Sequence, residues 1–341
     1  MPNKPSLRDV AKKAQVSVGT VSNVLNRPQQ VSETTRQKVR SAIDMLGFIP
    51  NEIMRTSSKD SQIIGVILPL SNNPFYEELA QGIEDSVAKD GLRVLIGYSR
   101  EDEAIELHLL SSMVDAGFKG VILTPVGGNN QVFEKFFDKN VRVGFISQTD
   151  VHVDQCSVAI DQVRGGYIGI EYLAKLGHKK ILWVSGPTHH HQSNQRFVGI
   201  TEAAKEFEIE LSVVRSPSLD FVSGENIAPE IIEAGLPDAI FAGNDSLALG
   251  IMNYFHKVGI NVPDEVSVIG YDNISYAESA LVPLTTVSQT PYQLGFTMGS
   301  QMVAEIAANH DHVHQHAIFQ PQIVERASAS KKHNSEQKYG G

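Results

Sequence analysis

Hydrogen-bonding and aromatic side chains stand at the ends of short apolar runs throughout the body of this sequence. Phe75 and Tyr76 follow "IIGVILP", Ser147 ends "VRVGFIS", Asp272 ends "SVIGYD" and Gln289 ends "TTVSQ". Side chains of these types hold small polar ligands, through hydrogen bonds and through contact with a rigid ring. No nucleophile–base pair, dinucleotide glycine motif or metal-ligand set accompanies them, so the pattern favours binding over catalysis.

The apolar runs themselves have the character of parallel strands. They are apolar on both faces, and helical stretches separate them, as expected for strands covered by helices on both sides. The rhythm occurs twice along the chain, which predicts an α/β protein with two doubly wound lobes. Such sheets bind ligands beyond the carboxyl ends of their strands, where the polar side chains stand. An Asp after a strand is also a common helix cap, and we expect Asp245 to cap the helix "SLALGIM".

Two histidine tracts suggest further chemistry. The imidazoles of "HHHQ", residues 189–192, would favour an acidic or phosphorylated ligand, or the loop is simply solvated. In "HDHVHQH", His310 to His316, alternate residues of a strand would share a face, and zinc binding is conceivable. No cysteine or fixed set of partners supports such a site. We therefore predict neither a metal site nor a cofactor.

The first 60 residues differ from the rest in charge. They hold ten Lys/Arg and five Asp/Glu, for a net charge of +5, whereas the remaining 19 basic and 34 acidic residues give −15. A basic head on an acidic body is suited to a polyanionic partner, although a solvated helical surface would look similar.

Three short helices are predicted in this head. Ser6 with Asp9, Ser17 and Ser32 are N-cap signals, and a tight turn separates the first two helices, which is typical of a helix-turn-helix. The second helix of such a unit lies in the major groove. Gly19 costs that helix roughly 1 kcal/mol relative to Ala. Close approach to DNA would explain the glycine, and so would tight packing between helices.

The head "LRDVAKKAQVSVGTVSNVLNRPQQVSETTRQKVRSAIDMLGFIPN" resembles, without gaps, that of the lactose/galactose repressor (LacI/GalR) family of bacterial transcription regulators. The resemblance implies a ligand-controlled repressor that binds double-stranded DNA at a palindromic operator as a homodimer. Asn23 stands where many members have Arg, which changes the preferred base from guanine to adenine. The residues implied to face base edges are Val18, Gly19 and Asn23, and those implied to hold phosphates are Ser17, Thr20, Ser22, Asn26, Ser32 and Thr35.

The body, from Gln62 to about Arg326, is similar to the effector domain of the same family, which is itself periplasmic-binding-protein-like. "NPFYEELAQGIED", "YLAKLGHKKI", "NDSLALGIM" and "PLTTVSQ" carry the resemblance. It implies a cleft for a sugar, nucleoside or sugar phosphate, in which Arg196 clamps the ligand and Phe221 stacks on it. Many sugar-binding relatives have Asp where this chain has Ser147. The effector-binding residues that we expect are Phe75, Tyr76, Ser147, His190, Gln192, Arg196, Phe221, Asn244, Asp272 and Gln289.

The expected organisation is an all-α helix-turn-helix headpiece at 1–50, a hinge at 51–61 and a two-lobed doubly wound effector domain at 62–326. Lobe 1 takes residues 62–161 and 292–326, lobe 2 takes 162–291, and we expect a disordered tail at 327–341. In the hinge, Ser57 occupies the position of the leucine by which relatives wedge open the minor groove. We therefore expect a weakly ordered hinge and a less sharply bent operator; the alternative is that Met54 or Ile53 takes over as the wedge after a register shift.

Alternative functions are a solute-binding protein of a transporter and an enzyme on a doubly wound fold. The lack of a signal-like N-terminus and the single cysteine, Cys156, favour the cytoplasm. No run of 18 apolar residues predicts a membrane span.

Overall fold

The computed structural model describes most of the head and body. The described residues are 5–26, 28–46, 48, 62–70, 72–126, 133, 141–146, 155–188, 190–308 and 312–332. The chain divides into two compact units, Met1–Asp60 and Ser61–Gly341, each of which is considered by itself. The proposed hinge at 51–61, with Ser57, lies outside the described residues, and so does Ser147.

The head is a small helical unit with its own core. Its elements are α1 (Leu7–Ala14), α2 (Val18–Asn26), the 3-10 turn η1 (Pro28–Gln30) and α3 (Glu33–Leu46). Ser6 and Asp9 form the expected capping box at the start of α1. The fully buried side chains Val10, Val21 and Val39 bring one residue from each helix into the core. The predicted three-helix head is therefore confirmed.

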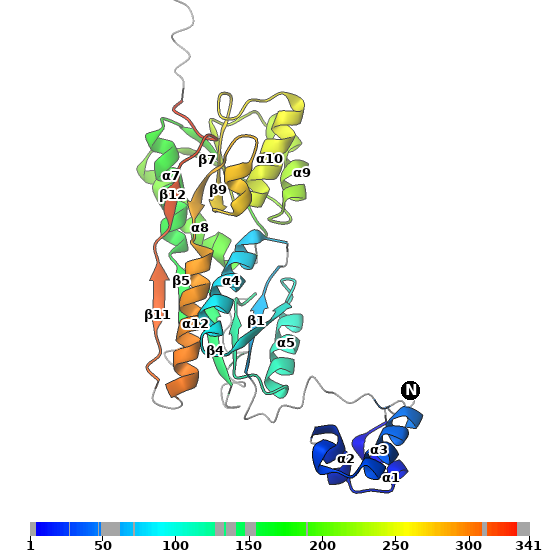
Figure 1. Ribbon diagram of the computed structural model, residues 1–341. Coiled ribbons are helices and arrows are strands. Elements are labelled where there is room, and N and C mark those ends of the chain that lie inside the picture. The colour runs from blue at the N-terminus through cyan, green and yellow to red at the C-terminus, as the bar shows by residue number, and fades with distance from the viewer. Residues whose placement is uncertain are drawn as a thin grey trace, which may run out of the picture. The chain divides into compact units, whose positions relative to one another are not determined.

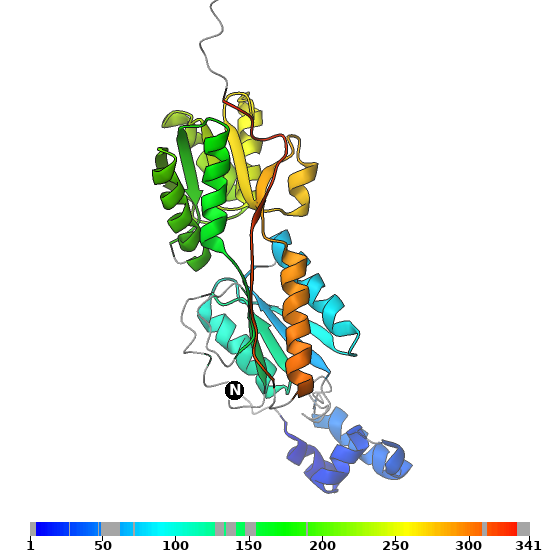
Figure 2. The ribbon, with the colours of Figure 1, turned by 90° about the vertical axis from the view of Figure 1, so that its left-hand side faces the viewer.

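The body consists of two lobes, each built on a six-stranded sheet (Figure 1). The sheet of lobe 1 has the order β11-β5-β4-β3-β1-β2, and all of its pairings are parallel. Its helices α4 (Pro74–Ala88) and α12 (Pro291–Ala308) lie side by side on one face, and α5 (Glu103–Asp115) covers the other (Figure 2). The strands are β1 (Ile63–Leu68), β2 (Arg93–Tyr98), β3 (Gly120–Leu123), β4 (Arg142–Ile146), β5 (Ser157–Ile160) and β11 (His316–Phe319).

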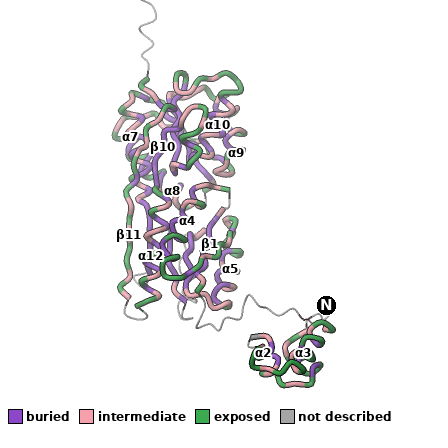
Figure 3. Tube along the Cα trace, viewed as in Figure 1, coloured by how far each residue is buried: buried purple, intermediate pink, exposed green. Residues whose placement is uncertain are grey.

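Lobe 2 repeats the plan, with strand order β12-β10-β9-β8-β6-β7. Only β12 is antiparallel to its neighbour. Its strands are β6 (Lys180–Ser185), β7 (Glu210–Arg215), β8 (Ala239–Ala242), β9 (Ser267–Asp272), β10 (Thr285–Ser288) and β12 (Gln322–Val324). Its helices are α7 (Gln162–Lys175), α8 (His191–Glu206), α9 (Phe221–Glu233), α10 (Asp245–Val258) and α11 (Ser275–Ser279). Buried residues run along the central strands of both lobes, and exposed ones lie on the outer helices (Figure 3). The two-lobed, doubly wound fold is as predicted.

Helices α4 and α12 touch backbone to backbone. A Cβ on Gly82 would lie 2.1 Å from the carbonyl oxygen of Tyr292, and one on Gly295 would lie 2.0 Å from that of Leu79. Only glycine fits at such a contact, because the obstructing atoms are backbone and cannot rotate away. The contact holds α4 against α12, and the start of α4, which Asn73 caps by accepting from Phe75 N at 3.0 Å, carries Phe75 and Tyr76.

Two of the expected boundaries are wrong. Residues 322–324 were assigned to lobe 1, but they form β12 and pair with β10 of lobe 2. The tail was expected to be disordered from residue 327, yet Ser328 is fully buried and its backbone oxygen accepts from Val268 N at 2.8 Å. Ser328 Oγ also accepts from Thr285 N at 2.8 Å. Ser328 thus satisfies backbone N–H groups inside lobe 2, and the polar composition of the tail gave no sign that this segment is ordered.

Candidate functional site

In the head, α2 packs with one face and leaves the other exposed. Val21 and Val24 are buried, whereas Val18, Gly19 and Asn23 are exposed, Val18 by 44%. Ser17 Oγ accepts from Thr20 N at 3.0 Å, so Ser17 caps the helix as predicted. Of the other expected phosphate contacts, Ser22 is half-buried, Asn26 ends α2, and Ser32 and Thr35 lie at the start of α3 with their hydroxyls 2.9 Å apart.

The environment of Gly19 distinguishes between the two explanations offered for it. A Cβ at Gly19 would meet only Ser17 Oγ, at 3.6 Å, an ordinary van der Waals distance. No packing between the described parts of the head therefore requires a glycine, and the cost in helix propensity remains unexplained by the head alone. A surface that must approach another molecule closely would explain it.

In the body, a cavity opens between the lobes at the carboxyl ends of their strands. It is lined from lobe 1 by residues that follow β1, β2 and β3, and from lobe 2 by residues that follow β6, β7, β8 and β10 and by Asp272, the last residue of β9. Eight of the ten expected effector residues line it, namely Phe75, Tyr76, His190, Gln192, Arg196, Asn244, Asp272 and Gln289. The parallel topology brings these residues together although they span more than 200 positions in the chain.

A buried chain of hydrogen bonds connects Arg196 and Asp272, two charged residues of the cavity. Arg196 Nε donates to Gln162 Oε1 at 2.7 Å, Gln162 Nε2 to Gln289 Oε1 at 2.8 Å, and Gln289 Nε2 to Asp272 Oδ1 at 2.5 Å. Tyr271 supports Arg196 through its ring, with the guanidinium carbon 3.7 Å from the ring centroid. Arg196 and Asp272 are only 5% and 4% exposed. Both charges are thus fixed in position before any ligand arrives.

Asp272 is held in an unfavourable state. Burial raises its pKa to about 6, against the lowering effects of the Arg196 charge and of hydrogen bonds with Gln289 and Asn73. Its backbone is also strained, with φ of +111°, and Asn273 follows at +58°. Strain and a perturbed carboxyl at one position are typical of binding sites, where a ligand compensates for them.

A contact between a histidine and a carboxylate spans the cleft. His190 Nε2 of lobe 2 lies 3.1 Å from Glu101 Oε1 of lobe 1. Glu101 follows β2 and has φ of +60°, so its backbone too lies in the left-handed region. The pair links the lobes at the edge of the cavity, and His191 and Gln192 stand beside it at the start of α8.

Comparison with known proteins decides the family. Residues 6–51 match the model of bacterial regulatory proteins of the lacI family, and residues 170–329 match that of a periplasmic binding protein-like domain. The transcriptional regulator DegA of Bacillus subtilis (strain 168), an HTH-type protein, is 32% identical over 337 residues, which cover 96% of this chain and 98% of DegA. The chain belongs to the lacI family. It is a DNA-binding regulator of transcription, as its head predicted, and not an enzyme.

Solved structures of lacI-family proteins share the fold of this chain. The lac repressor dimer bound to operator and the anti-inducer ONPF is 25% identical, with a TM-score of 0.72 over 96% of this chain and 100% of that one. A lacI-family regulator from Enterococcus faecalis V583 with bound ribose is also 25% identical, with a TM-score of 0.72 over 80% of this chain and 100% of that one. No helix within the described ranges is long and apolar enough to cross a bilayer.

The structure does not place Phe221 in the cleft. Asp220 caps α9 by accepting from Ser223 N at 2.7 Å, so Phe221 is the first residue of the helix. It is 41% exposed and lies with Met252 and Tyr276 on another part of lobe 2. Leu219, two residues earlier, lines the cavity instead. The cap at Asp220 explains why Leu219 and not Phe221 lines the cavity, because it places Phe221 in the helix and leaves Leu219 in the preceding loop.

The caps of α10 also differ from expectation. Asn244, not Asp245, is the N-cap, since Asn244 Oδ1 accepts from Leu247 N at 2.9 Å. Its Nδ2 donates to Leu219 O at 2.9 Å, so Asn244 also holds the Leu219 loop against the cavity. Asp245 is fully buried, and its Oδ2 accepts from Ile274 N at 2.9 Å. Burial raises the pKa of Asp245 well above its ordinary value.

Sequence reasoning missed several cavity residues. Gln162, Leu219 and Glu101 take part in the network or the lining but were not predicted. A signal existed for Gln162, because it directly follows the strand end "SVAID". For Glu101 the strand end lay in "LRVLIGYS", three residues earlier, and only the turn after it brings the carboxylate to the cleft.

Proposed function

We propose that this lacI-family protein is a cytoplasmic repressor that acts as a homodimer on a palindromic operator and is controlled by a small polyhydroxylated ligand. The observation that carries the proposal is the buried network from Arg196 to Asp272 beneath an interlobe cavity, in a chain that also carries a helix-turn-helix head. The network fixes a cation and a carboxyl for a ligand whose binding couples the two lobes.

In the head, the proposed contacts fall into two classes. Val18, Gly19 and Asn23 on the exposed face of α2 read base edges, and the absence of any internal packing need for Gly19 supports its close approach to DNA. The hydroxyl and amide side chains expected from the resemblance, those of Ser17, Thr20, Ser22, Asn26, Ser32 and Thr35, hold phosphates, which position the head without specifying a sequence. Asn23 favours adenine within each half-site.

In the cleft, the proposed ligand is a sugar, a nucleoside or a sugar phosphate. A carboxylate accepts hydrogen bonds from vicinal hydroxyls, and a guanidinium donates to hydroxyl or carboxylate oxygens, so Asp272 and Arg196 match such a ligand. Tyr76 and Leu219 supply apolar surface against a ring. The histidines at 190 and 191 suit a phosphate or carboxylate substituent, which extends the range beyond neutral sugars.

Two measurements test the proposal. Selection from random double-stranded DNA with the full-length protein should recover a palindrome with adenine contacts in each half-site. A thermal-shift screen of pentoses, hexoses, nucleosides and their phosphates should then yield a ligand that changes the affinity for that DNA. Recovery of no palindrome, or a ligand that leaves DNA affinity unchanged, would refute ligand-controlled repression.

A matched pair of variants tests the cleft itself. Leu219→Ala removes apolar contact from the cavity and should weaken the ligand about ten-fold, since roughly 1–2 kcal/mol of burial is lost. Phe221→Ala removes a larger side chain outside the cavity and should leave ligand affinity within about two-fold. Equal effects of the two substitutions would place the ligand elsewhere.

A further inference from the structure

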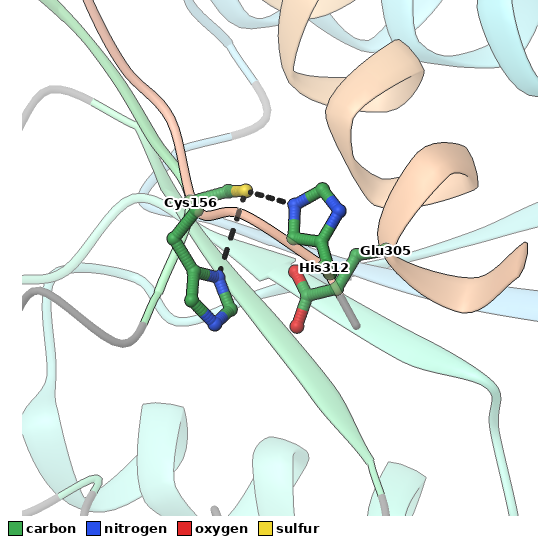
Figure 4. A group of neighbouring side chains, drawn as sticks. Cys156, Glu305 and His312 are labelled. Atoms are coloured by element: carbon green, nitrogen blue, oxygen red, sulfur yellow. Dashed lines mark hydrogen bonds between the residues drawn. The ribbon is translucent and has the colours of Figure 1, made fainter. Parts of the chain in front are cut away.

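Four side chains of metal-binding type lie together in lobe 1, away from the ligand cleft. They are Cys156, Glu305, His312 and His314, and one ligand atom from each lies within 4.8 Å of all the others (Figure 4). The sequence prediction dismissed a zinc site because no cysteine supported the histidine tract. That reasoning is wrong, since Cys156 lies more than 150 residues from the tract but beside it in the fold.

The group is assembled from three separate segments. Cys156 immediately precedes β5, Glu305 is in the last turn of α12, and the two histidines precede β11. Because β5 and β11 are parallel neighbours, their amino ends lie at the same edge of the sheet. The cavity between the lobes lies at the carboxyl ends of these sheets, so the four-residue group lies at the opposite edge from the cleft.

The interatomic distances are those of ligands around a single ion. Cys156 Sγ lies 3.1 Å from His312 Nε2 and 3.8 Å from His314 Nδ1. In a tetrahedral zinc site, bonds of about 2.3 Å to sulfur and about 2.1 Å to nitrogen place the two ligand atoms about 3.6 Å apart. The observed values lie on either side of this separation, so small side-chain rotations would suffice to bind an ion.

Glu305 supplies an independent sign of a missing partner. The residue is only 5% exposed, and its Oε2 is buried without a hydrogen-bond partner among the described residues. Arg142 Nε lies 3.9 Å from the other carboxylate oxygen, Oε1, which is longer than a hydrogen bond. A buried carboxylate oxygen left unpaired is costly, so natural proteins supply a donor or a cation.

We propose that Cys156, Glu305, His312 and His314 bind one divalent transition-metal ion, with Zn²⁺ as the favoured occupant. Thiolate and imidazole ligands select zinc over Mg²⁺ and Ca²⁺, which prefer oxygen. Four protein ligands complete a tetrahedral shell, so the site is structural and leaves no position for catalysis. The ion joins the end of α12 to the edge strand β11 and to β5, and thereby anchors the strand that runs on into lobe 2 (Figure 2).

The first test is zinc affinity of the full-length protein after treatment with a chelator. Competition with a chromophoric chelator should show one tight site per chain. Cys156→Ser and His312→Ala should each weaken zinc binding at least about 100-fold. Loss of a residue that only supports a ligand already weakens metal binding by up to about 100-fold, and these two substitutions remove ligands themselves. His316→Ala is the matched control, because His316 belongs to the same tract but its Nδ1 pairs with Ser157 Oγ at 2.9 Å. It should keep zinc affinity within about three-fold.

The second test identifies the ligand atoms. Co²⁺ bound to the wild-type protein should give a near-ultraviolet thiolate charge-transfer band and the intense visible bands of a tetrahedral ion. Cys156→Ser should abolish the charge-transfer band, and Glu305→Gln should change the visible bands while keeping the charge-transfer band. Circular dichroism checks that each variant is folded. Equal zinc binding by wild-type, Cys156→Ser and His312→Ala proteins, or equal loss in His316→Ala, would show only adventitious binding by the histidine tract and overturn the proposal.

Discussion

Asp272→Asn should make the ligand-free protein more stable at neutral pH, although it removes a carboxylate from the cleft. Asp272 is almost fully buried, and its pKa is about 6 in the fold against an ordinary value of 3.8. The carboxyl of Asp272 therefore binds its proton more tightly in the folded state than in the unfolded state. The free energy of unfolding falls as pH rises from about 3.8 to about 6. Asn resembles the neutral acid in shape and tolerates a positive φ better than most residues.

The magnitude follows from the two pKa values, 3.8 and about 6. They differ by about 2.2, and each unit corresponds to about 1.36 kcal/mol, so ionised Asp272 costs about 3 kcal/mol at pH 7. The same relation leaves a cost of only about 1 kcal/mol at pH 4.5. The stability advantage of the Asn variant should therefore shrink about three-fold on acidification, because the wild-type carboxyl becomes protonated.

The single tryptophan makes the measurement specific. Trp183 is fully buried in β6 of lobe 2, in the same sheet as Asp272, so its fluorescence during urea unfolding reports on this lobe. Asp238→Asn is the control in the same lobe. Burial alone would raise the pKa of Asp238, but hydrogen bonds from Lys332 and from the backbone of Lys180 and Lys179 bring it below the ordinary value. That substitution should destabilise lobe 2 at pH 7.

An Asp272→Asn variant that is no more stable than wild type at pH 7, or whose stability advantage does not decrease toward pH 4.5, would contradict this prediction. Destabilisation by both substitutions would mean that Asp272 is stabilised by its partners more than burial costs it.

Four other predictions concern the head, the hinge and the lobes. A fragment that begins at Gln62 should fold and bind no operator in a gel-shift assay, and operator binding by the fragment would contradict the prediction that the head supplies the DNA affinity. The affinity of the full-length protein for its operator should weaken about 1,000-fold or more between 50 and 200 mM salt through counterion release. Gly82→Val should destabilise lobe 1 by at least about 1–3 kcal/mol in calorimetry, because α12 backbone occupies the Cβ position. Arg196→Ala should weaken the ligand about ten- to a hundred-fold by calorimetric titration and leave DNA affinity unchanged, since a buried ligand group loses its charged partner. Inserting Leu between Thr56 and Ser57 should increase operator bending measured by energy transfer and sharpen the preferred half-site spacing, and a wild-type protein that already kinks its operator strongly would contradict the weak-hinge prediction.

Local features of this protein follow from short stretches of sequence. Ser6 with Asp9 forms its capping box and Ser17 caps α2 because a cap depends on residues three positions apart. Strands such as "IIGVIL" are identifiable because parallel strands buried on both faces must be apolar throughout. For the same reason the cleft could be predicted at the strand ends, and Arg196, Asp272 and Gln289 do meet there.

Other features were decided only by the tertiary structure. The family resemblance implied Phe221 for the cleft, but the start of α9 at that residue places it outside and leaves Leu219 in the lining. Gln162 links Arg196 to Gln289 only because α7 follows a strand of the other lobe. Cys156 contacts His312 only because β5 pairs with β11, an edge strand that follows it about 150 residues later in the chain. Side-chain type is a local property, whereas proximity depends on register and on the order of strands in a sheet, which no short stretch of the chain contains.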